Sequence, residues 1–186
     1  MLQLIAIVEL ALCWIGWTLA FINPRKKAAN QKQAAIATAS RWGIFLVMLG
    51  YACIWARIRP GGFTKSAPSL IASMILGPLS VALVWAATRH LGKQWRFQAA
   101  ISQDHELIKT GPYGFLRHPI YTSMFGMLTA TGAALTWWPM WVAGSIFFIA
   151  GTEIRVRAED RLLSERFHQE FADYRSRVRA YIPFVR

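Results

Sequence analysis

Five apolar runs alternate with polar segments along this chain of 186 residues. The runs cover residues 2–22, 42–55, 69–88, 120–135 and 138–154. A helix needs about 20 apolar residues to cross a hydrocarbon core of about 30 Å. The first and third runs reach that length, and we expect the second to begin a few residues earlier. The last two are shorter, which indicates tilt and close packing. The pattern therefore predicts an all-α bundle of about five transmembrane helices.

Proline, glycine and tryptophan mark the ends and the middle of these runs. Asn23-Pro24 ends the first helix, because proline disfavours helical geometry in the residue before it. Gly77-Pro78 lies in the middle of the third run and predicts a kink or a close helix contact. The uncharged Trp137-Trp138 joint between the last two runs predicts a tight hairpin at the membrane interface.

The segment after the fifth run, residues 155–185, has a different pattern. Its apolar residues recur at three- and four-residue steps among Arg, Glu and Asp; they are Leu163, Phe167, Phe171, Tyr174 and Val178. This spacing predicts an amphipathic helix that ends before Pro183. We expect it to lie along the membrane or to cap the bundle.

The composition favours a membrane protein of one domain. Hydrophobic residues make up 55% of the chain and charged residues 16%, whereas a soluble domain carries about 25% charged residues. The net charge of +12 does not indicate nucleic-acid binding, because no recognition motif accompanies it. The basic residues lie in short loops and in the C-terminal segment, as expected for segments that face an anionic cytoplasmic leaflet.

The charged loops also predict an orientation. With the N-terminus outside, the loop 23–41, the stretch 89–119 and the C-terminal segment all face the cytoplasm. One loop breaks the rule, and it carries Arg57, Arg59 and Lys65. The first run lacks the basic region of a signal peptide, so we expect a membrane anchor.

Three groups with reactive side chains lie inside apolar runs: Glu9, Cys13 and Cys53. A carboxylate within a membrane span is a functional candidate, but Glu9 is near enough to the N-terminus to reach the interface or to remain protonated, and we favour that interpretation. The two cysteines are too few for a metal cluster and are expected to be small buried hydrophobic residues.

A polar stretch, Gln98–Tyr121, interrupts the apolar pattern. It contains a Gly111-Pro112 turn, and Pro119 suits the first position of a helix. That helix start is expected to present free amides beside His118 and Tyr121, where an anionic group can bind, and Arg117 adds positive charge. An ordinary interfacial loop with aromatic and basic anchors explains these residue types equally well.

Residues typical of several other site classes do not occur in the sequence. His105 and His118 are 13 positions apart without a Cys or carboxylate framework, so we expect no metal site. There is no Gly-rich phosphate loop and no nucleophile elbow. Arg155 and Glu159 are four apart and share a helix face. They form either a surface ion pair, or a cation for an anionic substrate beside a carboxylate for a hydroxyl-bearing or cationic ligand.

Taken together, two regions resemble the isoprenylcysteine carboxyl methyltransferase family of integral-membrane enzymes. The first region contains Leu91-Gly92, Trp95, His105-Glu106-Leu107-Ile108, Gly111-Pro112-Tyr113 and Arg117-His118-Pro119-Ile120-Tyr121. The second contains Arg155, Glu159-Asp160, Leu163, Phe167, Tyr174 and Ile182-Pro183. Each piece is short, but their order and spacing around a membrane hairpin make the joint resemblance specific. It covers roughly the C-terminal half of the chain.

The resemblance implies a cytoplasmic site for S-adenosylmethionine. The positions that correspond to the family's cofactor contacts are Gln98, His105, Glu106, Leu107, Ile108, Tyr113, His118, Pro119, Ile120, Tyr121 and Glu159. Glu159 corresponds to a carboxylate for the ribose hydroxyls, and Arg155 to an arginine near the acceptor carboxylate. Two positions depart from the family pattern: His168 stands where the family has glycine, and Asp160 replaces a second glutamate.

The function expected from this resemblance is methyl transfer from S-adenosylmethionine to a lipophilic acceptor, with a carboxylate favoured. The alternatives are a phospholipid amine or a small thiol as the acceptor and, outside the enzymes, a membrane scaffold or transporter. We expect one domain, in which residues 1–90 provide three spans and 91–119 the cofactor-binding stretch. Residues 120–154 then form the hairpin and 155–186 the amphipathic segment. The expected partners are the lipid bilayer and the lipophilic substrate, and not nucleic acid.

Overall fold

The computed structural model of this chain describes residues 1–22, 38–56, 65–92 and 107–181. Within these ranges the chain forms five α-helices and one short 3₁₀ helix. They are α1 (Leu2–Ile22), α2 (Thr38–Trp55), α3 (Ala67–Leu91), η2 (Gly111–Gly114), α4 (Pro119–Leu135) and α5 (Trp138–Arg177). Each of the five apolar runs lies in one of the α-helices, so the prediction of an all-α bundle is confirmed.

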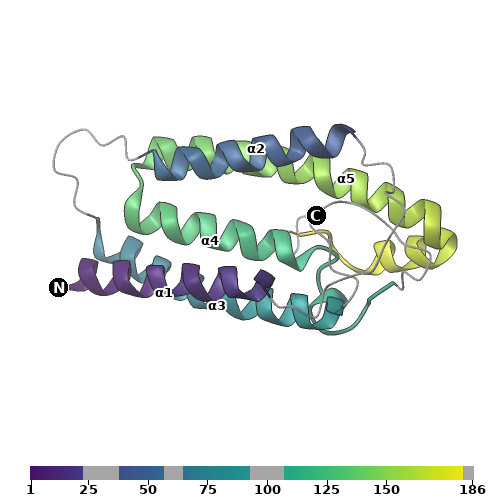
Figure 1. The fold of residues 1–186 in the computed structure, drawn as a ribbon, viewed down its shortest axis with the longest axis horizontal. Coiled ribbons are helices and arrows are strands. Elements are labelled where there is room, and N and C mark those ends of the chain that lie inside the picture. Colours follow the sequence, from purple (N-terminus) through teal and green to yellow (C-terminus); the bar gives the residue numbers. More distant parts are fainter. Residues whose placement is uncertain (23–37, 57–64, 93–106, 182–186) are drawn as a thin grey trace.

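The five helices lie side by side along one axis, and α4 lies between two helix pairs (Figure 1). On one side α2 packs along α5, and on the other α1 packs along α3, which in turn packs along α4. Successive helices run in opposite directions. As a result, the ends of α1, α3 and α5 and the starts of α2 and α4 meet at the same end of the bundle.

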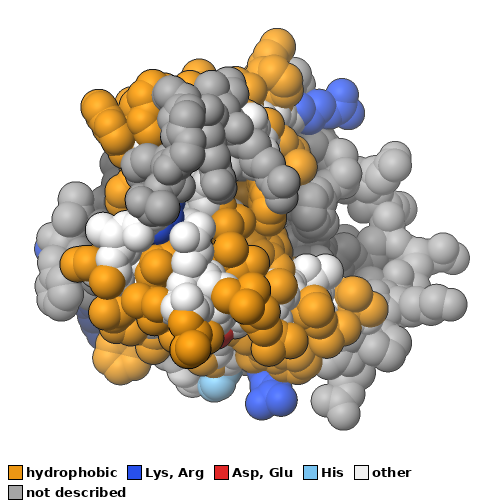
Figure 2. All heavy atoms as spheres, turned by 90° about the vertical axis from the view of Figure 1, so that its left-hand side faces the viewer, with side chains coloured by type: hydrophobic (Ala, Val, Ile, Leu, Met, Phe, Trp, Pro, Cys, Tyr) orange, Lys and Arg blue, Asp and Glu red, His pale blue; other side chains and the backbone are white. Residues whose placement is uncertain are grey.

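The outer faces of the helices are apolar as well as the inner ones. Along α1 the exposed large side chains include Leu4, Ile5, Val8, Leu12 and Ile15. Hydrophobic side chains also cover most of the described part of the bundle end that carries the α4–α5 turn (Figure 2). By length and composition, α1 and α3 are apolar enough to cross a membrane. The count of five spans stays a prediction.

The close pairing of α2 with α5 depends on glycines. Gly43 of α2 lies against Gly151 of α5, and Gly50 lies against Gly144. A Cβ atom added at Gly43 would lie 2.8 Å from the Gly151 carbonyl oxygen, and one added at Gly50 would lie 2.7 Å from the Gly144 carbonyl oxygen. The two backbones therefore touch, as small residues permit in membrane helix pairs.

Gly77 makes a similar approach on the other side of the bundle. A Cβ atom there would lie 3.1 Å from the Cys13 sulfur of α1, so the predicted close helix contact is confirmed. The Cys13 thiol donates a hydrogen bond to Glu9 at 3.1 Å. Cys13 is buried, as expected, whereas Cys53 is only partly buried.

Lys65 is one of the three basic residues in the loop that violates the expected cytoplasmic placement of positive charge, and the structure gives it a role in the fold. Its ammonium group donates to the carbonyl oxygens of Gly132 at 3.0 Å and Thr136 at 2.5 Å, at the C-terminal end of α4. A cation is favourable there because the helix dipole places partial negative charge at that end. The charge of Lys65 thus serves the fold of the bundle. Arg57 and Arg59 lie outside the described residues.

The last span and the first part of the amphipathic segment, which we expected as two elements, are continuous in α5, and the 40 residues of α5 form two helices joined at a kink. Between residues 150 and 167 the sequence changes from apolar to charged. It contains no proline in this interval, so nothing interrupts the backbone and the helix continues. Within α5 the backbone leaves helical geometry at His168, where φ is 42° and ψ is −115°. The helix ends at Arg177, before Pro183 as predicted.

Candidate active site

The Gly111-Pro112 turn forms the 3₁₀ helix η2 and packs against the end of α3. Gly111 has a φ of 59°, a conformation that glycine adopts without a steric penalty. The imidazole ring of His90 lies where a side chain at position 111 would stand. His90 itself is held by a 2.8 Å contact between Nδ1 and the Ala86 carbonyl oxygen. No motif in the sequence predicted that His90 contacts this turn.

Residues 178–181 run alongside the start of α4 and bind its backbone. The amides of Arg117 and His118 donate to the carbonyl oxygens of Arg179 at 2.7 Å and Ala180 at 2.8 Å. The amides of Tyr121 and Thr122 donate to the His118 carbonyl oxygen at 3.1 Å and 3.4 Å. The prediction of free amides at this helix start is therefore wrong for Tyr121 and Thr122, because the His118 carbonyl oxygen is their acceptor.

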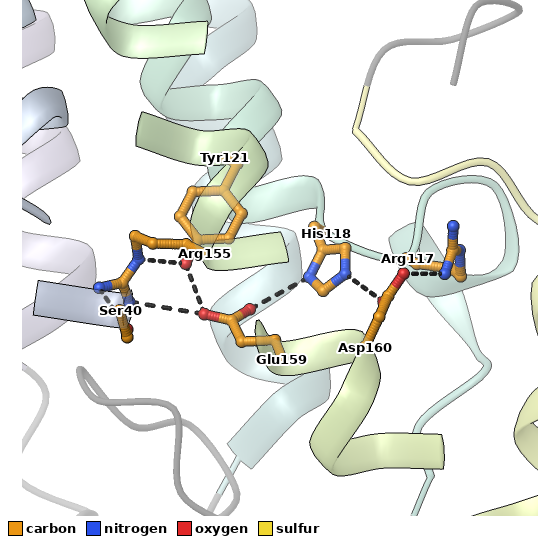
Figure 3. A network of polar contacts seen from close by, with 7 residues as sticks. All are labelled: Ser40, Arg117, His118, Tyr121, Arg155, Glu159 and Asp160. Carbon is orange, nitrogen blue, oxygen red and sulfur yellow. Dashed lines mark hydrogen bonds and ion pairs between the residues drawn. The ribbon is translucent and has the colours of Figure 1, made fainter. Parts of the chain in front are cut away.

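A network of seven side chains connects α2, α4 and α5 at this end of the bundle (Figure 3). Its members are Ser40, Arg117, His118, Tyr121, Arg155, Glu159 and Asp160. Sequence positions more than a hundred residues apart meet here, because the starts of α2 and α4 lie beside the middle of α5.

The first half of the network surrounds Arg155. Its Nε atom donates to the Tyr121 hydroxyl at 2.6 Å, and its Nη2 atom lies 3.5 Å from Glu159 Oε1. The Tyr121 hydroxyl in turn donates to the same Glu159 oxygen at 2.5 Å. The Arg155 guanidinium also lies 5.6 Å from the centre of the Tyr121 ring. Tyr121 thus bridges a cation and a carboxylate, and the predicted proximity of Arg155 and Glu159 is confirmed.

The second half of the network surrounds His118. Its Nδ1 atom lies 3.3 Å from Glu159 Oε2, and its Nε2 atom lies 2.9 Å from Asp160 Oδ1. The other Asp160 oxygen accepts a hydrogen bond from Arg117 at 2.6 Å. Arg117 also donates to the Val178 carbonyl oxygen at 3.0 Å. One imidazole therefore joins two neighbouring carboxylates of α5.

These contacts fix the charge of the network. Burial alone would lower the pKa of His118, but the hydrogen bonds to Asp160 and Glu159 raise it to about 9. Burial alone would raise the pKa of both carboxyls, yet the bonds and charges of His118 and the neighbouring arginines lower them. At neutral pH the site therefore holds an imidazolium between two carboxylates.

Glu159 and Asp160 differ in how much room they have for a ligand. The side chain of Asp160 is 9% exposed, and both of its oxygens bind cations of this chain. The side chain of Glu159 is 22% exposed. A carboxylate accepts up to about four hydrogen bonds, and Glu159 already faces Tyr121, Arg155 and His118, so it has room for about one further donor, such as a ribose hydroxyl. Of the two carboxylates, Glu159 fits the cofactor role inferred from the sequence.

The structure brings part of the predicted site together. His118, Tyr121, Arg155 and Glu159 lie in the network, and the buried Pro119 begins α4 beside them. Of the other predicted residues, Leu107, Ile108 and Ile120 are partly buried, and Tyr113 is buried in η2. The Tyr113 carbonyl oxygen accepts a hydrogen bond of 2.6 Å from Tyr174. Three predicted residues, Gln98, His105 and Glu106, lie outside the described residues.

Three members of the network were not among the predicted cofactor or acceptor contacts: Ser40, Asp160 and Arg117, which had been expected only to add positive charge. Arg117 precedes His118 in the sequence and Asp160 follows Glu159. Because one is basic and the other acidic, their ion pair could have been predicted from these positions. Ser40 gave no such signal, because it lies at the start of an apolar run far from both motifs.

The chain belongs to the isoprenylcysteine carboxyl methyltransferase (ICMT) family, whose model matches residues 71–165. This confirms the resemblance inferred from the motifs. The family uses S-adenosylmethionine, and the matched residues include the start of α4 and the part of α5 that carries Arg155 and Glu159.

The chain is also similar in sequence to two individual proteins. The chain is 35% identical over 83 residues to the protein-S-isoprenylcysteine O-methyltransferase of Saccharomyces cerevisiae, which is 44% of this chain and 34% of that protein. It is 30% identical over 106 residues to the nickel-cobalt-cadmium resistance protein NccN of Alcaligenes xylosoxydans xylosoxydans, which is 56% of this chain and 49% of that protein. The chain therefore matches between a third and a half of the length of these relatives.

Proposed function

We propose that this protein is an integral-membrane enzyme that transfers the methyl group of S-adenosylmethionine to a lipophilic acceptor, with a carboxylate favoured. The observation that carries the proposal is the buried contact of Arg155, Tyr121 and Glu159 at one end of the bundle. It joins the two motifs of the family in one place. A protein-S-isoprenylcysteine O-methyltransferase among the relatives supports a prenylcysteine carboxylate as the first acceptor to test.

Glu159 is the residue proposed to bind the cofactor. When bound, S-adenosylmethionine supplies a methyl group activated by the positive charge of its sulfur. Glu159 is held by His118 and Arg155 and is the more exposed of the two carboxylates. Its partners fix the carboxylate before any ligand arrives, which lowers the cost of ordering the site on binding. Gln98, His105, Glu106, Leu107, Ile108, Tyr113, His118, Pro119, Ile120 and Tyr121 stay proposed cofactor contacts.

Arg155 is the residue proposed to orient the acceptor. Its side chain is 8% exposed, and a charge-assisted hydrogen bond from its guanidinium would hold a carboxylate in a fixed direction. A carboxylate acceptor already has a lone pair, so the reaction needs no general base. The catalytic task is alignment of acceptor and methyl group, which can lower a barrier by about 7–11 kcal/mol.

The membrane context of the proposal follows from the apolar surfaces of the bundle. We propose five spans, with the N-terminus outside and the site at the cytoplasmic end, where a polar cofactor has access from the cytosol. The apolar faces of the helices would let a lipophilic acceptor approach from the bilayer.

Binding of S-adenosylmethionine to detergent-purified protein tests the cofactor assignment. We expect Glu159→Ala to weaken binding by about 10- to 100-fold, because a hydrogen bond to a charged group contributes roughly 1.5–3 kcal/mol. Glu165→Ala is the matched control, since Glu165 lies on the same helix in an exposed pair with Arg161. Equal affinity in the Glu159→Ala variant would remove the assignment of Glu159. No binding by the natural protein would favour a scaffold or transporter.

Turnover by an arginine variant tests the acceptor assignment. We expect Arg155→Ala to lower the methyl-transfer rate far more than the affinity for S-adenosylmethionine. Arg157→Ala is the control, because the Arg157 side chain is exposed and its guanidinium pairs with Glu153 at 2.7 Å. An equal loss of rate and cofactor affinity in the Arg155→Ala variant would move Arg155 into the cofactor site.

The acceptor class is tested with labelled methyl groups. Prenylcysteine, fatty acid, phospholipid and thiol acceptors are offered to the same preparation, and the labelled product is identified. A pH–rate profile separates the alternatives further. An amine or a thiol must lose its proton before attack, whereas a carboxylate is already deprotonated at neutral pH. A rate that rises steeply with pH would favour a phospholipid N-methyltransferase or a small-thiol S-methyltransferase.

A further inference from the structure

The start of α2 lies against the arginine that we propose to orient the acceptor. This helix is outside residues 71–165, which match the family, and the sequence motifs gave it no role beyond spanning the membrane. Its buried face is formed by residues at three- and four-residue steps: Ser40, Gly43, Val47, Gly50 and Ile54. The first two of these contact Arg155.

Arg155 continues the seam by which α5 packs on α2. The α5 side of the seam is formed by Gly144, Phe148, Gly151 and Arg155, again at three- and four-residue steps. Gly50 faces the beginning of this series and Gly43 faces its end. Arg155 is therefore a charged residue in a position where its neighbours on both helices are small or apolar.

Gly43 provides the space that the stem of Arg155 occupies. A Cβ atom at position 43 would lie 2.6 Å from Arg155 Cγ, which is closer than two carbon atoms can approach, and 3.4 Å from the Arg155 amide nitrogen. Cγ lies near the backbone end of the side chain, so it cannot move without changing the direction of everything beyond it. The absence of a side chain at position 43 thus determines the path of the arginine.

Contacts from three helices then fix the end of the side chain. Ser40 of α2 accepts from Nη1 at 3.5 Å, the long end of the hydrogen-bonding range, while Tyr121 of α4 accepts from Nε at 2.6 Å. Glu159 of α5 lies 3.5 Å from Nη2. Each guanidinium nitrogen is directed toward a different helix, and α2 contributes both the space for the stem and one acceptor for the head.

We propose that Gly43 and Ser40 of α2 are positioning residues that set the direction of the Arg155 guanidinium toward the acceptor. The inference rests on the role proposed above for Arg155. Neither residue needs to touch the acceptor, because each acts through Arg155. A helix outside the matched region thereby controls acceptor binding, while the cofactor side of the site is formed by α4 and α5.

A pair of glycine variants tests this inference. Gly43→Ala and Gly50→Ala each place a methyl group against a backbone carbonyl of α5, at 2.8 Å and 2.7 Å respectively. They therefore strain the same helix pair to a similar degree, but only Gly43→Ala meets Arg155. The readout is the Nε–H signal of Arg155, recorded by NMR on protein labelled with ¹⁵N-arginine. The signal is assigned by its loss in Arg155→Lys. We expect it to shift in Gly43→Ala and to keep its position in Gly50→Ala.

Kinetics with N-acetyl-S-farnesylcysteine at saturating S-adenosylmethionine provide the second readout. Gly43→Ala is expected to raise the KM for this acceptor about tenfold, the effect of one misdirected charge-assisted hydrogen bond. Its affinity for S-adenosylmethionine should change less than about threefold, which is below 1 kcal/mol. Gly50→Ala should leave the KM unchanged. Equal effects of the two variants on the Arg155 signal and on the KM would overturn the inference.

A variant without added bulk covers the case in which Gly43→Ala does not fold. Ser40→Ala is expected to raise the same KM about threefold, as loss of one weak hydrogen bond predicts, whereas Ser145→Ala, which removes a bond within α5, should not. No change in Ser40→Ala would then overturn the inference. Failure of the natural protein to bind S-adenosylmethionine or to methylate the probe would instead contradict the proposed function, and the NMR comparison would still decide the role of α2.

Discussion

At the scale of single residues, the Tyr121 hydroxyl connects the two charged groups on which the proposed chemistry depends. It accepts from Arg155 and donates to Glu159. We expect Tyr121→Phe to lower stability by about 1–3 kcal/mol, the cost of leaving buried polar groups without a partner. It should also weaken S-adenosylmethionine binding, because Glu159 loses one of its fixed contacts. Thermal unfolding in detergent and cofactor titration measure the two effects.

Tyr51→Phe is the control for this prediction. Its hydroxyl donates to the Met124 carbonyl oxygen at 2.8 Å, and neither residue is a proposed cofactor contact. We expect this variant to lose stability but to keep its cofactor affinity. The same loss of affinity in both variants would show that Tyr121 acts only through the general stability of the bundle.

The charge of His118 predicts how stability depends on pH. Glu159 and Asp160 face the ring, and Arg117 lies behind Asp160. Because these contacts raise the pKa of His118 from 6.5 to about 9, the folded protein binds its proton more tightly than the unfolded chain does. The stabilisation, about 3 kcal/mol, is complete below pH 6.5. It should be lost as the pH rises from 6.5 to 9.

Melting temperatures measured between pH 6 and pH 10 check this dependence. The natural protein should melt at progressively lower temperatures up to about pH 9, and His118→Gln should show a flatter profile because its side chain does not titrate. A melting temperature that stays constant or rises over this interval would contradict an imidazolium in the folded state.

Only part of this network could be predicted from the sequence. Arg155 and Glu159 share a helix face at a fixed spacing, so their proximity follows from helical geometry alone. His118 and Asp160 are 42 positions apart, and their contact depends on how α4 lies beside α5. Ser40 is further still from Arg155 in sequence. Spacing rules describe neighbours on one helix and contain no information on which helices pack together.

At the scale of elements, α5 contains a strained residue. His168 has a φ of 42° and a ψ of −115°, a region that is costly for residues with a Cβ atom. We expect His168→Gly to stabilise the protein by about 1 kcal/mol, since the relief of strain exceeds the greater backbone freedom that glycine gives the unfolded chain. Thermal unfolding measures the change.

His168→Ala separates this explanation from a loss of histidine contacts. Alanine keeps the Cβ atom that causes the strain, so this variant should gain nothing. If both variants raised the melting temperature equally, the backbone conformation at position 168 would not be the cause.

The helices themselves were the most predictable elements, because each coincides with an apolar run of sufficient length. The continuity of α5 was not predicted. Hydrophobicity changes sharply near residue 155, but a helix ends where its backbone is interrupted and not where its surroundings change. The pairing of α2 with α5 had a partial signal in the equal seven-residue spacing of Gly43 with Gly50 and of Gly144 with Gly151.

At the scale of the whole molecule, the two ends of the bundle should lie on opposite sides of the membrane. Phe115 is 81% exposed at the end that holds the site, and Trp138 is 63% exposed at the other end. We expect a cysteine at position 115 to react with a membrane-impermeant maleimide only in inside-out vesicles, and a cysteine at position 138 only in right-side-out vesicles. Cys13 and Cys53 are replaced by serine in both. The reverse pattern would invert the proposed topology.

The backbone partners of the Arg117–His118 turn have a further consequence for the order of synthesis. Arg117 binds the carbonyl oxygen of Val178, a residue 61 positions further along the chain. At about 5–20 residues per second, a ribosome needs several seconds to add that length. During this interval the start of α4 lacks the segment that completes it. The ribosome therefore synthesises all five helices before the site can form. By then the helices can already enter the bilayer, so the newly made protein has no complete site before that point.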